Sequence, residues 1–425
     1  VTRGTLQTTF RNEPYDELRR LGLTDESERL AREAAPAQTG MLTVEQVIPG
    51  SAASEVLAPG DILIRVNGEL VTRFAPLGAL LDSHVGEEID IQLERGGKRI
   101  EAQVRVDDLH AITPDEYIEF GDAIVNRLSY QQARHYNRPA EGIYVANPGY
   151  LLSRAAIPRG AVIVEVAGEA VSSLDDFEAA LDKLADGERA LVRYVTMENP
   201  QNSIVRLLEM DRVWFPARRC ARDDALGVWP CRDLAAGPAP KPLEVGSTRL
   251  TRYKDPIVQA IAPSLVVVTF DLPYTLSGVA DRHYYGTGLI VDQDRGSGRV
   301  DRNTVPIGIG DVTVTFAGSL EVKGKVEQLH PLHNYAIVSY DPISIGSTPV
   351  QEARFNTETL RPGDEVWVVG IKGDHQLVHQ QSTVSSVDPL MLPLSRTLRF
   401  RDSNIEGISL VNAPGDVDGV LINRK

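Results

Sequence analysis

Apolar residues recur at every second position in many short stretches of this chain, and a period of two predicts β-strands. Residues 62–66 (ILIRV) and residues 162–166 (VIVEV) are two such stretches. Asn67-Gly68 follows the first and suits a tight hairpin, because its central residues need positive φ. After the second stretch, the apolar residues take the spacing of a short amphipathic helix. A pair of polar residues at N-cap spacing precedes this helix. The N-cap pair is Ser173 with Asp176, and the apolar face is Phe177, Ala180, Leu181 and Leu184.

The two stretches belong to an internal repeat with an interval of 100 residues. A second match, between GMLTVEQVIPGS from Gly40 and GIYVANPGYLLS from Gly142, is offset from this interval by two residues. Chance agreement at one constant interval is rare, so we expect two copies of one domain. The ungapped matches pair Gly60 with Gly160, Gly68 with Gly168, Val71 with Val171, and Leu81-Asp82 with Leu181-Asp182.

The order of strand, turn, helix and closing strand resembles a PDZ domain of the HtrA type in both copies. This resemblance implies that a partner's C-terminus adds as a strand beside the helix, and that a loop of backbone N–H groups holds its carboxylate. One loop in each copy stands at the corresponding position of the sequence. Neither of these two loops keeps the Gly-Leu-Gly-Phe pattern of the family well. Asp122 would also place a negative charge near the incoming carboxylate. The alternative is that one or both copies are spacers with occluded grooves. The candidate peptide-binding residues are Gly4, Thr5, Leu6 and Gln7 in the first copy, and Phe120, Gly121, Asp122 and Ala123 in the second.

From about residue 250 the chain consists of short strands separated by glycine and aspartate turns, which predicts a sandwich or a barrel. Two strands resemble those of the chymotrypsin-like double β-barrel of HtrA proteases. YYGTGLIVD is similar to the strand before the catalytic histidine, and LRPGDEVWVVGI is similar to the segment that opens the second barrel. The predicted fold class is therefore mainly β with short helices: two PDZ-like domains followed by a degenerate trypsin-like double barrel.

The resemblance also implies three positions for a catalytic triad. They hold Thr304 in VDRNTVP, Asn334 in HNYAIVSYD, and Glu406 five residues before the Val-Asn of SLVN. Threonine cannot serve as a general base, and asparagine carries no charge to stabilise an imidazolium. Glu406 would place an anion where the oxyanion develops. We therefore expect no catalytic residue in this chain by itself, although the family is one of serine endopeptidases.

Rival assignments remain open. His330 and His333 lie near the acid position, and Ser403 and Ser409 lie near the nucleophile position, so a displaced triad is an alternative. The two histidines have no acidic or cysteine partner at a metal-ligand spacing, and we expect no metal and no cofactor.

Residues 211–234 (DRVWFPARRCARDDALGVWPCRDL) are rich in aromatic and arginine residues, and they indicate an extension that packs on a neighbouring domain. Its two cysteines, Cys220 and Cys231, can form one bridge. A Pro/Gly/Ala linker follows. The expected domains are residues 1–106 (PDZ-like), 107–215 (PDZ-like), 216–247 (extension and linker) and 248–425 (degenerate protease domain, truncated at its C-terminus).

Composition narrows the function further. The 425 residues carry a formal charge of −15, which disfavours nucleic-acid binding. No apolar run is long enough for membrane insertion. The chain begins at Val1 and stops at Lys425 after an apolar strand, so we expect a piece of a longer protein. The sequence leaves the compartment undecided: nucleus if fungal-like, periplasm or cytoplasm if bacterial.

Two long segments, DLHAITPDEYIEFGDAIVNRLSYQQARHYNRPAEGIYVANPG and WFPARRCARDDALGVWPC, carry a closer resemblance. They are similar to the fungal nuclear pro-apoptotic HtrA-like serine proteases with duplicated protease domains. This implies a non-catalytic segment that recognises protein or peptide C-termini and unfolded substrates, with a pseudo-protease scaffold and possible homo-oligomerisation through the parent protein. The alternatives are a stand-alone peptide-binding or chaperone-like module, or a protease with a displaced triad.

Overall fold

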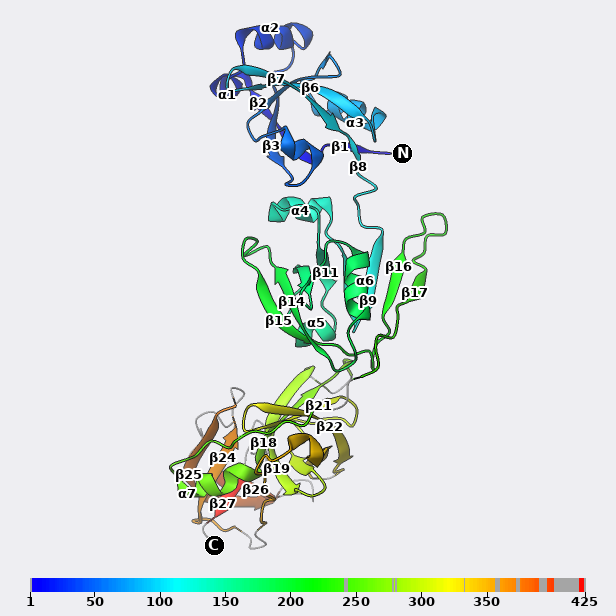
Figure 1. The fold of residues 1–425 in the computed structure, drawn as a ribbon. Coiled ribbons are helices and arrows are strands. Elements are labelled where there is room, and N and C mark those ends of the chain that lie inside the picture. Colours follow the sequence, from blue (N-terminus) through cyan, green and yellow to red (C-terminus); the bar gives the residue numbers. More distant parts are fainter. Residues whose placement is uncertain are drawn as a thin grey trace. The chain divides into compact units, whose positions relative to one another are not determined.

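The computed structural model describes residues 2–240, 244–276, 279, 281–331, 333–355, 360–371, 375–389, 396–400 and 420–423. The chain divides into two compact units, residues 1–241 and 242–425 (Figure 1). Both units are built mainly of antiparallel strands with short helices, so the predicted fold class is confirmed.

The first copy of the repeat contains a six-stranded antiparallel sheet with the strand order β2-β3-β4-β6-β7, and β5 pairs with β4. Helices α1 and α2 are inserted between β2 and β3. The predicted turn is present, because Asn67 and Gly68 have φ angles of 47° and 80°. Apolar residues of the sheet and of α3 form one core. The elements are β1 Gly4–Thr5, β2 Thr8–Pro14, α1 Tyr15–Leu21, α2 Asp25–Ala34, β3 Gly40–Val47, the 3-10 helix η1 Ala52–Glu55, β4 Ile62–Val66, β5 Glu69–Leu70, α3 Phe74–Ser83, β6 Glu88–Arg95, β7 Lys98–Arg105 and β8 Asp107–Asp108.

The second copy contains a nine-stranded sheet with the order β15-β14-β12-β11-β10-β9-β16-β17, and β13 pairs with β12. Helix α6 begins with the predicted cap, a capping box between Ser173 and Asp176. Its predicted apolar face is buried. The elements are β9 Glu116–Phe120, β10 Ala123–Arg127, α4 Tyr130–Tyr136, β11 Ile143–Asn147, α5 Leu151–Arg154, β12 Val162–Val166, β13 Glu169–Ala170, α6 Leu174–Asp182, β14 Arg189–Val195, β15 Ile204–Glu209, β16 Arg218–Ala221 and β17 Cys231–Asp233.

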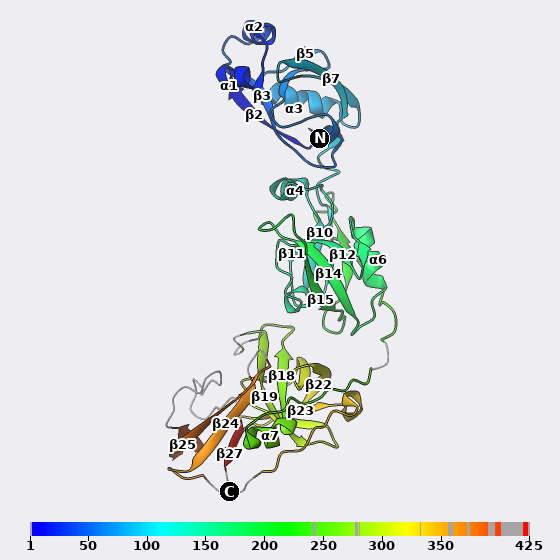
Figure 2. The ribbon, with the colours of Figure 1, turned by 60° about the vertical axis from the view of Figure 1, so that its left-hand side comes forward.

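The aromatic and arginine-rich segment after β15 adds strands β16 and β17 to this sheet. Figure 2 shows α6 beside the sheet of the second copy. A disulfide joins Cys220 of β16 to Cys231 of β17, which are opposite each other in the register of the two strands. The segment is therefore part of the second copy's own sheet.

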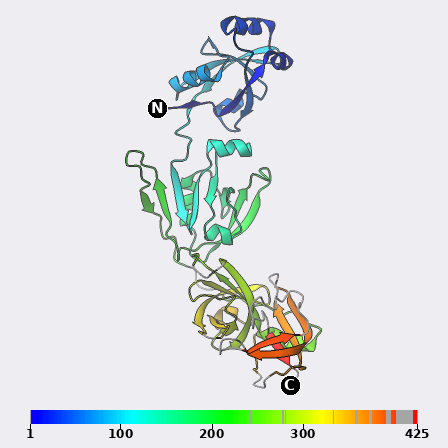
Figure 3. The same cartoon turned by 180° about the vertical axis from the view of Figure 1, so that it is seen from behind.

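The second unit consists of a closed barrel with the order β18-β19-β20-β23-β22-β21, and a smaller sheet with the order β26-β25-β24-β27. Figure 3 shows the barrel in green to yellow and the smaller sheet in orange to red. Valines and aromatic residues from the strands fill the barrel. The elements are α7 Pro256–Ile261, the 3-10 helix η2 Ala262–Ser264, β18 Leu265–Asp271, β19 His283–Asp292, β20 Ser297–Val300, β21 Asp311–Phe316, β22 Leu320–Leu329, β23 Ala336–Tyr340, the 3-10 helix η3 Pro342–Ile345, β24 Glu365–Ile371, β25 Leu377–Pro389, β26 Arg396–Phe400 and β27 Val420–Asn423.

Within the described ranges of the chain, no helix has the length and apolar character needed to cross a membrane.

Candidate functional site

The first candidate loop lies against the C-terminal end of helix α3. Gly4 and Thr5 form the short strand β1, and Leu6 and Gln7 lead into β2. A Cβ on Gly4 would lie 2.1 Å from the carbonyl oxygen of Leu81, so only glycine fits at this contact. Gln7 has a φ of 51°, which turns the chain from one strand to the next.

Several polar groups of this loop are already engaged. The Gly4 N–H donates to Oδ1 of Asp82 at 2.9 Å, and the Gln7 N–H donates to Oγ1 of Thr5 at 3.0 Å. The Gln7 side chain donates to Oδ2 of Asp107 at 2.9 Å. The carboxylate of Asp82 therefore lies at the loop where the resemblance expects a ligand's carboxylate.

Strand β2 lies at the edge of the main sheet of the first copy. β2 pairs with β3 from Thr8 opposite Val47 to Pro14 opposite Gly40. No described strand pairs with the other side of β2. Leu6 and two leucines of α3 belong to one apolar cluster, on which Phe10 is partly buried. Strand addition needs such an unpaired edge with an apolar surface beside it.

The second candidate loop is arranged differently. Phe120 ends β9 and Ala123 begins β10, and these two residues are paired opposite each other. Gly121 and Asp122 have φ angles of 53° and 65°, as in a two-residue hairpin turn of type I′. The edge of β10 away from β11 is therefore paired with β9 of the same chain.

In the barrel, the structure brings the Thr304 segment and Asn334 together. Val300 at the end of β20 is paired with Ala336 at the start of β23, and the Arg302 N–H donates to Oδ1 of Asn334 at 3.1 Å. Thr304 is buried, and its hydroxyl donates to Oδ2 of Asp301 at 2.7 Å. Glu406, Ser403 and Ser409 lie outside the described residues.

His330 and His333, the rival histidines, lie close together. Their ring centroids are 4.6 Å apart, and the His333 N–H donates to Nδ1 of His330 at 2.9 Å. Partial burial lowers the pKa of His330, and the positive charges of His333, Arg299 and Arg302 lower it further. Nδ1 of His330 accepts a hydrogen bond, which is the role of a neutral imidazole. In the described part of the chain, no group of three or more His, Cys, Asp or Glu side chains could hold a metal ion.

One imidazole–carboxylate pair in the second unit is not apparent from the sequence. Nδ1 of His283 lies 2.6 Å from Oδ1 of Asp271, across strands β19 and β18. The carboxylate is buried and the imidazole is exposed. A carboxylate that orients a histidine is one part of a proton relay, and it also stabilises a strand pair. Twelve residues separate the two side chains in sequence, so only the strand register reveals the pair.

Two family models match the repeats. Residues 43–95 match a model described as a PDZ domain, and residues 111–187 match one described as a PDZ-like domain. The fold and these matches define a chain with two PDZ domains and a closed six-stranded barrel.

The chain is also similar to curated proteins over its whole length. It is 35% identical to the pro-apoptotic serine protease nma111 of Neosartorya fischeri, over 100% of this chain and 42% of that protein. It is 32% identical to Protease Do-like 7 of Arabidopsis thaliana, over 96% of this chain and 47% of that protein. These relatives confirm the resemblance to HtrA-like serine proteases that carry PDZ domains. The chain spans about two-fifths of the first of them.

Solved structures show a weaker likeness. Deg5 has a TM-score of 0.30 and 16% identity, over 39% of this chain and 77% of that one. The HtrA-type protease AlgW with tripeptide has a TM-score of 0.30 and 14% identity, over 39% of this chain and 49% of that one.

Proposed function

We propose that this chain is a non-catalytic segment of an HtrA-like serine endopeptidase, in which the first PDZ domain recognises protein substrates and the barrel unit is a scaffold. One observation carries this proposal. Asn334 accepts a hydrogen bond from the segment that holds Thr304, so the residues expected at the acid and histidine positions of a triad lie close together. Neither side chain can accept a proton from a nucleophile or stabilise an imidazolium.

The hydrogen bond of Thr304 supports the same conclusion. Its hydroxyl donates to Asp301, and its N–H donates to the other oxygen of that carboxylate at 3.0 Å. This arrangement closes a local turn at the position where a catalytic base would have to face a substrate. The position therefore has a structural role in the barrel.

The test of the non-catalytic assignment is an activity assay on the chain itself. We expect no cleavage of casein and no labelling by a fluorophosphonate probe, with an active serine protease as the positive control. Labelling of a serine would overturn the proposal. If any turnover occurs, Ser403→Ala and Ser409→Ala identify the nucleophile of a displaced triad.

Peptide recognition is assigned to the edge of β2 in the first copy. That strand is unpaired on one side among the described strands, whereas the corresponding strand β10 in the second copy is paired on both sides. An extended peptide can therefore form backbone hydrogen bonds with β2 without displacing any part of the chain.

A peptide array with free and amidated C-termini tests this assignment. We expect binding of extended peptides, and Phe10→Ala should weaken it because this side chain lies on the apolar cluster beside the edge. Met197→Ala is the matched control, because Met197 is an exposed apolar residue of the second copy. Equal losses in both variants, or binding unchanged by Phe10→Ala, would contradict the assignment.

A further inference from the structure

The second copy holds one of its own strands where a PDZ domain binds a peptide. β9 runs antiparallel to β10, with Ile118 opposite Val125 and Phe120 opposite Ala123. The side chains of Ile118 and Phe120 are fully buried in the core of the second copy. β9 is thus an internal ligand, because it pairs with the backbone N–H and C=O groups at the edge of β10.

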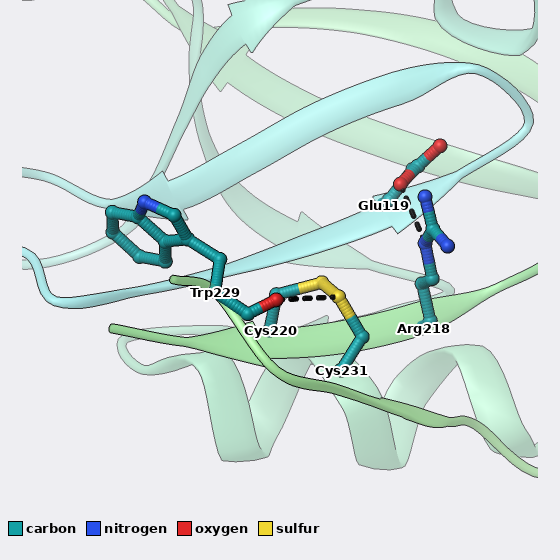
Figure 4. The surroundings of a disulfide bond; sticks show 5 residues. All are labelled: Glu119, Arg218, Cys220, Trp229 and Cys231. Carbon is teal, nitrogen blue, oxygen red and sulfur yellow. Dashed lines mark hydrogen bonds and ion pairs between the residues drawn. A yellow bond between two sulfur atoms is a disulfide. The ribbon is translucent and has the colours of Figure 1, made fainter. Parts of the chain in front are cut away.

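Strand β16 covers the outer edge of β9. The four residues of β16 pair with β9, from Arg218 opposite Glu119 to Ala221 opposite Glu116. The Arg218 Nε donates to Oε2 of Glu119 at 2.8 Å (Figure 4). β9 is therefore enclosed between β10 and β16.

Arg219 of β16 connects β9 to helix α6. Its guanidinium forms ion pairs with Glu116 of β9 and with Asp175 and Glu178 of α6, and its side chain is largely buried. In a PDZ domain the ligand strand lies next to this helix. Strand β16 consequently contacts both β9 and α6, the two elements that meet at this position.

Strand β17 and the loop before it add two more contacts. Arg232 of β17 forms an ion pair with Glu178 of α6 at 2.6 Å. The rings of Trp229 and Tyr117, a residue of β9, have centroids 5.3 Å apart. β17 contains only three residues, all of them exposed, and it is the last strand of its sheet. So short an edge strand has few interactions to hold it without the disulfide to β16.

The two cysteines of the disulfide differ in exposure. Cys220 is fully buried beside β9, whereas Cys231 is exposed. A thiolate from solvent can therefore approach Cys231, while Cys220 is the buried leaving group. The chain contains no other cysteine, so a reductant acts on this pair alone.

We propose that the Cys220–Cys231 disulfide is a redox-sensitive clasp that keeps β9 in the peptide-binding position of the second copy. Its reduction by a dithiol loosens β17 and β16, and the edge of β10 then accepts an extended peptide in place of β9. Because β9 defines the shape of the site, the peptide that fits is one with buried apolar residues at the positions of Ile118 and Phe120 and acidic residues at those of Glu116 and Glu119. This inference does not depend on peptide binding by the first copy.

The chemical step is thiol–disulfide exchange. A thiolate of the dithiol attacks Sγ of Cys231, the bond between the two cysteine sulfurs breaks, and Cys220 leaves as a thiolate that takes up a proton. The second thiol of the reductant then attacks the mixed disulfide and releases Cys231 as a thiol. Two electrons pass from the dithiol to the protein, and the reductant becomes a disulfide.

Hydrogen exchange and peptide binding together test the clasp. The full chain is compared in its oxidised form, after reduction with dithiothreitol, and as the double variant Cys220→Ala/Cys231→Ala, which carries no disulfide in any buffer. We expect amides of β9 to exchange at least ten times faster in the last two samples, while those of β11 keep their protection. A labelled peptide with the sequence EYIEF should bind in the last two samples and not in the oxidised chain.

Three results would overturn the proposal. The first is hydrogen exchange in β9 that is unchanged by reduction. The second is equal acceleration in β11, which would mean that the disulfide merely holds the whole copy folded. The third is peptide binding of equal strength in all three samples, or no peptide binding in any of them. Arg219→Gln provides a control without redox chemistry. It removes the ion pairs of Arg219 with Glu116 of β9 and with Asp175 and Glu178 of α6, and it should accelerate β9 exchange in the oxidised chain.

Discussion

The ring of Phe120, at the end of β9, packs edge-on against the ring of Phe177 in helix α6, with centroids 5.4 Å apart. Both side chains are fully buried in the core of the second copy. This contact joins strand β9 to helix α6 through the core of the second copy.

Phe120→Ala should strongly destabilise the second copy. Deletion of a buried phenylalanine ring removes its burial and leaves a cavity, which typically costs about 3–5 kcal/mol. The measurement is the free energy of unfolding from urea denaturation. Phe74→Ala is the control, because Phe74 is an exposed residue on α3, and its loss should change stability by less than about 0.5 kcal/mol.

The capping box of α6 should make the second copy sensitive to acid. Hydrogen bonds from the side chain and backbone of Ser172, and then from Ser173, lower the pKa of Asp176 from 3.8 to about 2. A carboxyl group with a lowered folded-state pKa stabilises the fold above its unfolded value, and this contribution is lost as the pH falls from about 4 toward 2.

The variant Asp176→Asn should flatten the dependence of unfolding free energy on pH between 4 and 2, measured by urea denaturation. Ser173→Ala should cost about 1 kcal/mol through loss of the N-cap acceptor. An undiminished pH slope in Asp176→Asn would show that other carboxyl groups cause the acid sensitivity.

Asp82→Asn should strengthen the binding of peptides with a free C-terminus to the first copy. The Asp82 carboxylate accepts from the Gly4 N–H, so it opposes a second carboxylate at the same loop. Removal of one partly exposed charge at short range is worth about 1 kcal/mol, or about fivefold in affinity.

Fluorescence anisotropy with free and amidated peptides measures the effect of Asp82→Asn. Asp16→Asn, which makes the same charge change on α1, should leave affinity unchanged, and an equal gain for amidated peptides would refute the electrostatic explanation.

His330 should titrate below the usual range of histidine. Partial burial lowers its pKa, and the neighbouring His333, Arg299 and Arg302 act in the same direction. Since the folded-state pKa lies below the unfolded one, the contribution of His330 to stability is present above the unfolded pKa and is lost as the pH falls through the folded pKa. NMR titration of the imidazole measures this pKa. His333→Gln should raise it toward the normal value, and no change in that variant would exclude His333 as a cause.

Thr304→Val should destabilise the barrel unit without any effect on proteolysis. The valine keeps the shape of the buried side chain but leaves one oxygen of Asp301 without the hydroxyl donor. Loss of one such bond costs about 1 kcal/mol or more. Thermal unfolding of the isolated chain shows this loss. A stability equal to that of the parent would mean that the Asp301 turn does not depend on the threonine.

The sequence by itself determined most of the fold. The interval of 100 residues revealed the two PDZ copies, and the capping pair Ser173 and Asp176 located the start of α6. The short stretches after residue 250 predicted strands, and YYGTGLIVD and LRPGDEVWVVGI are indeed found as β19 and β24. These features depend on local periodicity and on side chains that bond to their own backbone, so they can be recognised from neighbouring residues alone.

Only the tertiary structure decided which edge of each PDZ copy is covered, because strand pairing between distant segments is not encoded in local periodicity. The same distance in sequence explains why the pair between His283 and Asp271 was missed and why the arginine-rich segment was not recognised as two strands. Phe120, Gly121, Asp122 and Ala123 read as a candidate loop in the sequence, yet β9 and β10 bring them together as a hairpin. β16 then closes the outer edge of β9 from a position about 100 residues further along the chain. Such contacts form only when the whole domain packs, since burial of Phe120 against α6 requires the core to be complete.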